Sequence, residues 1–183
     1  TIKRHMETFA SMAEELSPYV DRCIFSFVEM YKKLSYNMPE LRAVTDEDKL
    51  TLAKGMGEIA RRSGLVLQTC ATKEDYSPFG IQQSGCMTAE IFSKALGIRF
   101  KKTPHKGNRA GCLCMESRGL GDYNSCPNGC RYCYANKDHA KAMENYRTHD
   151  PSSPLLLGHV RPDDRIIPSK QESIIEMEPS LFD

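Results

Sequence analysis

The sequence lacks long apolar runs, a strong net charge and internal repeats. No stretch of the 183 residues is apolar for long enough to cross a bilayer, and none joins a charged start to an apolar middle as a secretory leader does. We therefore expect a soluble cytoplasmic protein with no membrane partner. The formal net charge of +1 argues against a chain that binds polyanions over its whole surface. The length suits one domain, or one domain with an ordered tail.

Cysteine, by contrast, is abundant and clustered. The chain has 8 cysteines, and five of them fall between residues 112 and 133. In a chain without a secretory signal, such clustering indicates metal binding rather than disulfides. The five are Cys112, Cys114, Cys126, Cys130 and Cys133.

Hydrophobic periodicity and capping residues predict alternating helices and strands over the first hundred residues. This alternation is typical of an α/β layer with parallel strands. The predicted elements are a helix over 1–16, a strand over 23–28, a helix that Thr45 caps and Gly64 ends, a strand over 65–69, and a helix that Thr88 caps and Gly97 ends.

Two strands make a poor sheet by themselves, and the chain starts at Thr1 inside a helical pattern. We therefore expect the α/β part, residues 1–100, to be the C-terminal part of a (β/α) partial barrel whose upstream half is missing. Residues 101–137 are predicted to form a cysteine-rich loop that binds a metal cluster. Residues 138–183 are predicted to form a short helix, "HAKAMENYR", and an extended tail.

The stretch "CPNGCRYCYAN", residues 126 to 136, spaces three cysteines by three and then two residues. A 4Fe–4S cluster is usually held by four thiolates, so three leave one iron open. Pro127 and Gly129 supply the bends of a tight loop. An open iron can bind a small molecule through an amine and a carboxylate.

This stretch resembles the cysteine motif of radical S-adenosylmethionine enzymes. The resemblance implies that Cys126, Cys130 and Cys133 hold a 4Fe–4S cluster and that Tyr132 lies beside the adenine of S-adenosylmethionine. The wider sequence "GCLCMESRGLGDYNSCPNGCRYCYAN", with "DRCIFSFVEMYKK" and "LQTCAT", resembles the bacterial family "domain of unknown function 1848", whose motif lies near the C-terminus. Here only residues 134 to 183 follow the motif, and no glycine-glycine-acidic stretch lies among them.

Four further cysteines offer a second site. Cys70 follows the second predicted strand, where α/β folds place their chemistry, and with Cys86, Cys112 and Cys114 it makes four thiolates outside the motif. Such a set is enough for a second, fully ligated cluster, although Cys70 and Cys86 also fit as small apolar residues. The alternative metal is zinc, held by two cysteine pairs in a structural tetrahedron. Those pairs are Cys112 with Cys114 and Cys130 with Cys133.

The resemblance implies an enzyme that generates a 5′-deoxyadenosyl radical. Its substrate would be an unknown small molecule or macromolecule, and its electron donor a reduced ferredoxin or flavodoxin. Glu29, at the C-terminal end of the first predicted strand, is a candidate contact for substrate or cofactor, and a solvated strand-end carboxylate is the alternative. The basic stretch "RFKKTPHKGNR" could bind phosphate, from nucleic acid or a nucleotide, but a solvated basic loop is the favoured interpretation, because no row of aromatic residues accompanies it apart from Phe100. Two other functions stay open, a non-catalytic interaction module stabilised by zinc or a cluster, and an electron-transfer protein.

Overall fold

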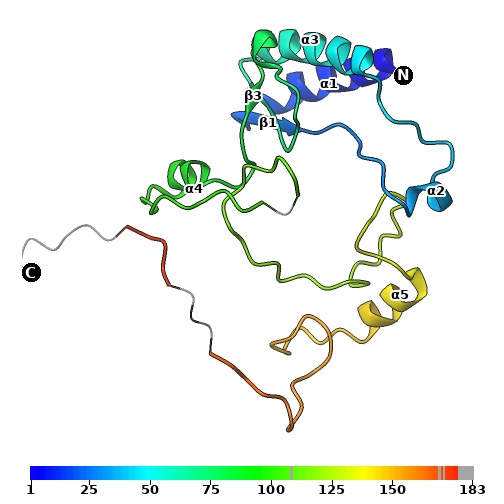
Figure 1. Cartoon of the computed structure of the whole chain (residues 1–183), viewed down its shortest axis with the longest axis vertical. Coiled ribbons are helices and arrows are strands. Elements are labelled where there is room, and N and C mark those ends of the chain that lie inside the picture. Colours follow the sequence, from blue (N-terminus) through cyan, green and yellow to red (C-terminus); the bar gives the residue numbers. More distant parts are fainter. Residues whose placement is uncertain (108, 169, 171, 177–183) are drawn as a thin grey trace, which may run out of the picture. The chain divides into compact units, whose positions relative to one another are not determined.

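The computed structural model describes residues 1–107, 109–168, 170 and 172–176, and its contacts divide them into two compact units (Figure 1). The first unit comprises Thr1–Val28, Ala43–Ser117 and residues 173–176, and the second comprises Glu29–Arg42 with the described residues of Arg118–Glu172. Among these residues, no helix is both long enough and apolar enough to span a membrane.

The first unit is a small α/β layer. Its three strands are all parallel, in the order β1-β2-β3, and residues 22 to 25 of β1 pair with residues 66 to 69 of β2. The elements, in chain order, are α1 (Ile2–Leu16), β1 (Arg22–Phe25), α3 (Asp46–Arg62), β2 (Val66–Thr69), the 3-10 helix η1 (Ser77–Phe79), β3 (Gln82–Gln83) and α4 (Ala89–Leu96).

Capping residues set the predicted helix ends. The Thr45 hydroxyl accepts a hydrogen bond from the Asp48 amide at 3.2 Å, and α3 begins at the next residue. The Thr88 hydroxyl caps α4 in the same way, and Gly97 ends that helix at φ 69°, a left-handed conformation that glycine adopts without strain. The sequence prediction of these two helices is confirmed.

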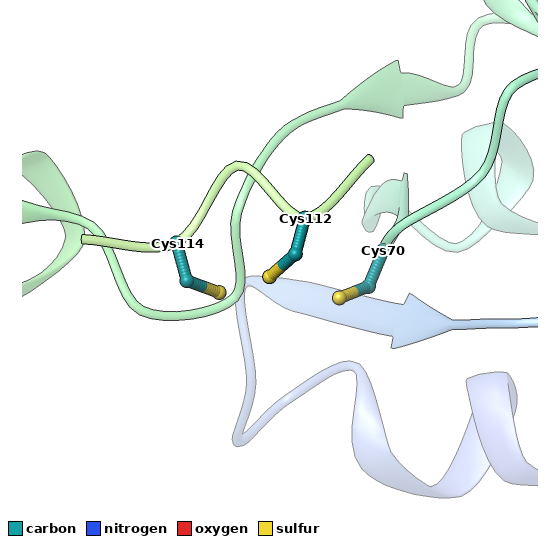
Figure 2. A group of neighbouring side chains, drawn as sticks. All are labelled: Cys70, Cys112 and Cys114. Carbon is teal, nitrogen blue, oxygen red and sulfur yellow. The ribbon is translucent and has the colours of Figure 1, made fainter. Parts of the chain in front are cut away.

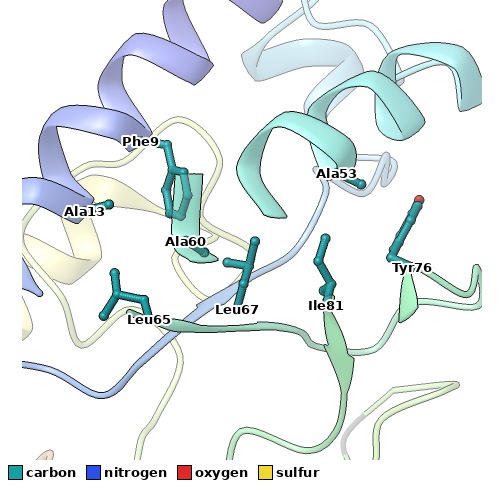
Figure 3. Close-up of a cluster of buried hydrophobic side chains, with 8 residues drawn as sticks. All are labelled: Phe9, Ala13, Ala53, Ala60, Leu65, Leu67, Tyr76 and Ile81. Carbon is teal, nitrogen blue, oxygen red and sulfur yellow. The ribbon is translucent and has the colours of Figure 1, made fainter. Parts of the chain in front are cut away.

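The core of the first unit lies between its helices and its sheet. Helices α1 and α3 pack side by side, and Figure 3 shows Leu67 of β2 and Ile81 pointing toward them. Leu67 is 1% exposed, and the partly buried Phe25 and Phe27 extend the cluster through edge-on ring contacts with each other and with Tyr76. The buried members are Phe9, Ala13, Ala53, Ala60, Leu65, Leu67, Tyr76 and Ile81.

The second unit has little regular structure. Its helices are α2 (Leu34–Asn37), a single turn, and α5 (His139–Arg147), which Asp138 caps by accepting from the Lys141 amide at 3.0 Å. Leu34 and Ala142 have no exposed surface. The predicted helix "HAKAMENYR" is confirmed as α5.

The mixed α/β class and the parallel pairing are confirmed, but the partial barrel stays a prediction. The first strand is shorter than predicted, because its pairing ends where β2 ends and Phe27 turns into the core. Helix α2 and strand β3 were not predicted. Strand β3 is two exposed glutamines, which carry no strand pattern, and α2 is a single turn in a stretch for which no element was predicted.

Candidate metal centre

Four cysteines from three separate segments of the first unit converge. Cys70 directly follows β2, Cys86 lies between β3 and α4, and Cys112 and Cys114 come from the segment after α4. Figure 2 shows the side chains of Cys70, Cys112 and Cys114 directed toward one another. We call Cys70, Cys86, Cys112 and Cys114 the four-thiol group.

The sulfur atoms of this group are close. The Sγ atoms of Cys70, Cys112 and Cys114 all lie within 4.8 Å of one another. The Sγ of Cys86 lies 3.9 Å from that of Cys70 and 3.4 Å from that of Cys114. Cys86 thus lies close to Cys70 and Cys114, but among the described residues it does not belong to the trio whose sulfurs all lie within 4.8 Å, and no short separation joins it to Cys112. An arrangement of this kind can hold a metal ion.

Local backbone contacts bring these segments together. Gln68 of β2 is fully buried, and its side-chain amide donates to the carbonyls of Ser84 and Gly85 at 3.0 Å each. Successive strand residues face opposite sides, so Gln68 and Cys70 lie on the side away from Leu67 and the helices. Gln68 thereby fixes the segment that leads into Cys86.

Two glycines allow close approach at the four-thiol group. A Cβ atom on Gly85 would lie 2.4 Å from the Leu113 carbonyl oxygen and 2.7 Å from the Cys114 amide nitrogen. A Cβ atom on Gly107 would lie 2.2 Å from the Cys112 sulfur. Any other residue at either position would displace the segment that carries Cys112 and Cys114.

Hydrogen bonds hold the segment around Cys114. The Met115 amide donates to the Met87 carbonyl at 2.8 Å, and the Lys106 amide donates to the Cys114 carbonyl at 3.0 Å. His105 Nδ1 lies 2.6 Å from the Leu113 carbonyl oxygen. Cys114 itself is only 8% exposed, so its thiol lies inside the unit rather than at its surface.

The surroundings of Cys86 and Cys114 shift the pKa values of their thiols in opposite directions. Burial, together with hydrogen bonds to the thiols of Cys114 and Cys70, raises the pKa of Cys86 to about 12, although the residue as a whole is exposed. Burial also disfavours the Cys114 thiolate. Hydrogen bonds from the Met87 backbone and from the neighbouring thiols of Cys86 and Cys112 outweigh that effect, so the pKa of Cys114 is lowered. Of these two thiols, Cys114 therefore has the lower pKa and forms the thiolate more readily.

The predicted motif cysteines lie in the second unit. We call residues 126–136 the motif loop. Cys126 and Cys130 are exposed and Cys133 is half-buried. Within the described residues, their three sulfurs do not form a group closer than 4.8 Å. A local contact shapes the loop, because the Asn136 amide donates to the Cys133 sulfur at 3.4 Å.

Residues 29 to 40 hold the motif loop through side chains that contact its backbone. The Lys33 ammonium donates to the carbonyls of Cys133, at 2.9 Å, and of Asn136, and the Tyr31 hydroxyl donates to the Tyr132 carbonyl. The neighbouring Arg131 guanidinium donates to the Asn37 carbonyl at 2.8 Å and pairs with Glu40 at 2.8 Å.

Tyr132 and Glu29, both predicted to contact a cofactor, lie together. The Glu29 amide donates to the Tyr132 hydroxyl at 3.0 Å, and that hydroxyl donates to the Glu29 carbonyl at 2.9 Å. The two residues touch through the backbone of Glu29, and Tyr132 remains 39% exposed. Their contacts with a cofactor stay a prediction.

The structure groups Cys112 and Cys114 with Cys70 and Cys86. The alternative tetrahedron of Cys112 and Cys114 with Cys130 and Cys133 stays a prediction. Cys23 of β1 packs against the core, and burial raises the pKa of its thiol. Gln68 and Lys33 were not singled out from the sequence. The one signal in the sequence was the position of Gln68 inside an otherwise apolar strand, which indicates a polar side chain with a specific partner.

Comparison with known proteins gives one match. The sequence model of the family described as "Domain of unknown function (DUF1848)" matches residues 1–135, well over half of the chain. The matched range includes the four-thiol group and the three motif cysteines. No curated protein and no solved structure matches the chain.

Proposed function

This chain belongs to the DUF1848 family, and we propose that it binds a 4Fe–4S cluster through Cys126, Cys130 and Cys133, with one iron open to S-adenosylmethionine. The observation that carries the proposal is the spacing of these three cysteines on one loop. Residues 29 to 40 make hydrogen bonds to this loop. Three thiolates suit a cluster that keeps one coordination position free.

The loop has features that fit an iron–sulfur cluster. Amide hydrogen bonds to ligand sulfurs help to set the potential of such clusters, and the Asn136 amide already donates to the Cys133 sulfur. The exposed Cys126 and Cys130 leave the outer side of the loop accessible. Gly129, at φ 63°, makes the turn between them, with the His139 imidazole 3.1 Å from where a Cβ would lie.

A hollow beside the loop offers room for part of a ligand. Its volume is about 480 Å³, and its lining includes Met30, Tyr31, Leu34 and Met38. Tyr31 also donates to the Tyr132 carbonyl, so the hollow adjoins the motif loop within the second unit. Apolar and aromatic linings of this kind suit the ring of a nucleoside.

A reduced cluster of this kind would give one electron to the sulfonium of S-adenosylmethionine, releasing methionine and a 5′-deoxyadenosyl radical that takes a hydrogen atom from the substrate. The chain's own residues hold the loop. Lys33 and Tyr31 fix the carbonyls around Cys133, and Tyr132 ties the loop to the backbone of Glu29. A reduced ferredoxin or flavodoxin would supply the electron, and the substrate stays unassigned.

The test is the iron and acid-labile sulfide content of the anaerobically purified protein, with its electron spin resonance spectrum before and after S-adenosylmethionine is added. We expect a 4Fe–4S signal that changes on addition, because the ligand binds the open iron. The Cys130→Ala variant should lose this signal, and Cys23→Ala, a core cysteine, should keep it.

Two results would count against the proposal. A full complement of iron in the Cys126→Ala, Cys130→Ala, Cys133→Ala variant would show that the motif loop is not the ligand set. Stoichiometric zinc on the loop without iron, under anaerobic expression, would favour the alternative function of a metal-stabilised interaction module.

A further inference from the structure

We propose that the four-thiol group, Cys70, Cys86, Cys112 and Cys114, holds a single Zn²⁺ ion in a closed structural site. This site is separate from the motif loop in residues, chemistry and role. It does not depend on the function proposed above, because none of its ligands belongs to the motif.

The sulfur separations select one metal ion over an iron–sulfur cube. Zinc binds thiolates at about 2.3 Å, so the sulfurs of a tetrahedral site lie about 3.8 Å apart. The two separations from Cys86, 3.9 Å to Cys70 and 3.4 Å to Cys114, lie close to that value, and the three separations within the Cys70–Cys112–Cys114 trio are at most 4.8 Å. A 4Fe–4S cube, by contrast, holds its ligand sulfurs roughly 6 to 7 Å apart.

The same separations argue against disulfides. The sulfurs of a disulfide lie about 2.05 Å apart, and all eight cysteines are free thiols. Cys86 also lies near two sulfurs at once, those of Cys70 and Cys114. A shared partner at the centre explains contacts of this kind, whereas pairwise bonding does not.

Contacts of the backbone and of a buried side chain bring the ligand segments together, although Cys86 itself is exposed. Gln68 holds the segment that leads into Cys86, and Gly85 and Gly107 let the segment of Cys112 and Cys114 approach. Ala71, directly after Cys70, lies at φ 50°, a left-handed conformation that residues with a Cβ rarely adopt. Cys114 is buried.

Four thiolates fill a tetrahedron and leave no position for substrate, which is the pattern of structural zinc. Thiolate sites also bind Zn²⁺ more tightly than Fe²⁺. The ion would tie together the end of β2, the segment before α4, and the segment after α4. Residues 101–117 contain no helix or strand among the described positions, only an isolated bridge of His105 with Met115. The metal would therefore stabilise a region that apolar packing does not.

The experiment uses the full chain with Cys126→Ala, Cys130→Ala and Cys133→Ala, purified anaerobically, so that motif-bound metal is absent. We expect about one zinc per chain, little iron and no sulfide. Adding Cys112→Ser should remove the zinc, whereas adding Cys23→Ser should leave it. Replacement of zinc by Co²⁺ should give the intense visible bands of a tetrahedral tetrathiolate ion.

A second measurement needs no variant of the site. Alkylation of the unmutated, anaerobic chain should spare the four-thiol group until a zinc chelator is added, as mapped by mass spectrometry of the peptides. Equal alkylation of these thiols with and without chelator would overturn the proposal. Iron and sulfide whose content depends on Cys112 would also overturn it, because they would mean a second cluster. A Cys86–Cys114 disulfide in the metal-free protein would overturn it as well.

Discussion

The Gly85→Ala variant tests whether close backbone approach builds the four-thiol group. The new Cβ would lie 2.4 Å from the Leu113 carbonyl oxygen, while ordinary contact begins at 3.4 Å. The segment of Leu113 and Cys114 would have to move by about 1 Å, the difference between these two distances. Neither Leu113 O nor Cys114 N is the end of a flexible side chain, so side-chain rotation cannot relieve the clash.

A shift of this size exceeds what a metal site tolerates. Ligand distances in a functional site lie within about 0.2 Å of their ideal values. We therefore expect zinc affinity to fall about 10- to 100-fold, as when supporting residues of metal sites are changed. Overpacking should also lower the free energy of unfolding by about 1 to 3 kcal/mol.

The assay is competition for zinc with a chromophoric chelator, together with urea unfolding of the zinc-loaded protein. Gly119→Ala is the matched control, because a Cβ there meets nothing within 4 Å. If Gly85→Ala binds zinc as tightly as the unmutated protein, the reasoning is refuted, because the Cys114 segment would then not need its close contact with residue 85.

Three further predictions concern capping, pH and the motif loop. Thr45→Ala should lower the free energy of unfolding by about 1 kcal/mol through loss of the α3 cap, whereas Thr51→Ala, at an exposed position inside α3, should not lower it; equal losses would contradict the capping argument. The hydrogen bond from Lys49 lowers the pKa of Glu74 from 4.5 to about 2. The unmutated protein should therefore have a higher free energy of unfolding than Glu74→Gln above pH 4.5, and this difference should vanish as the pH falls toward about 2. A difference that does not depend on pH in urea titrations would refute this. Tyr132→Phe should speed hydrogen exchange at the backbone amide that its hydroxyl contacts, with the iron content unchanged; unchanged exchange would mean that this contact does not hold the loop.

Local signals in the sequence were enough to predict most of the helices and the parallel pairing. Thr45 and Thr88 mark helix starts by short-range capping, and the apolar runs of β1 and β2 mark paired parallel strands. Strand β3 depends on pairing with β2 rather than on its own two glutamines, so its sequence gave no pattern to recognise.

The sequence could indicate that metal ligands are present but not how they group. The motif cysteines lie within eight residues, so their spacing carries the prediction by itself. In the four-thiol group, Cys70 and Cys86 are 16 residues apart and Cys86 and Cys114 are 28 apart. Their convergence depends on the buried amide of Gln68 and the close approach at Gly85, which are tertiary contacts.

X-ray absorption of one anaerobic sample of the unmutated protein, at both the iron and zinc edges, tests most directly whether the chain holds two kinds of metal centre. The zinc edge should show four sulfur neighbours at about 2.3 Å and no neighbouring metal, and the iron edge should show sulfur with nearby iron atoms. Iron with nearby iron atoms in the amount of two clusters per chain, and no zinc, would contradict the assignment of a single ion to Cys70, Cys86, Cys112 and Cys114. Zinc alone would contradict the cluster on the motif loop.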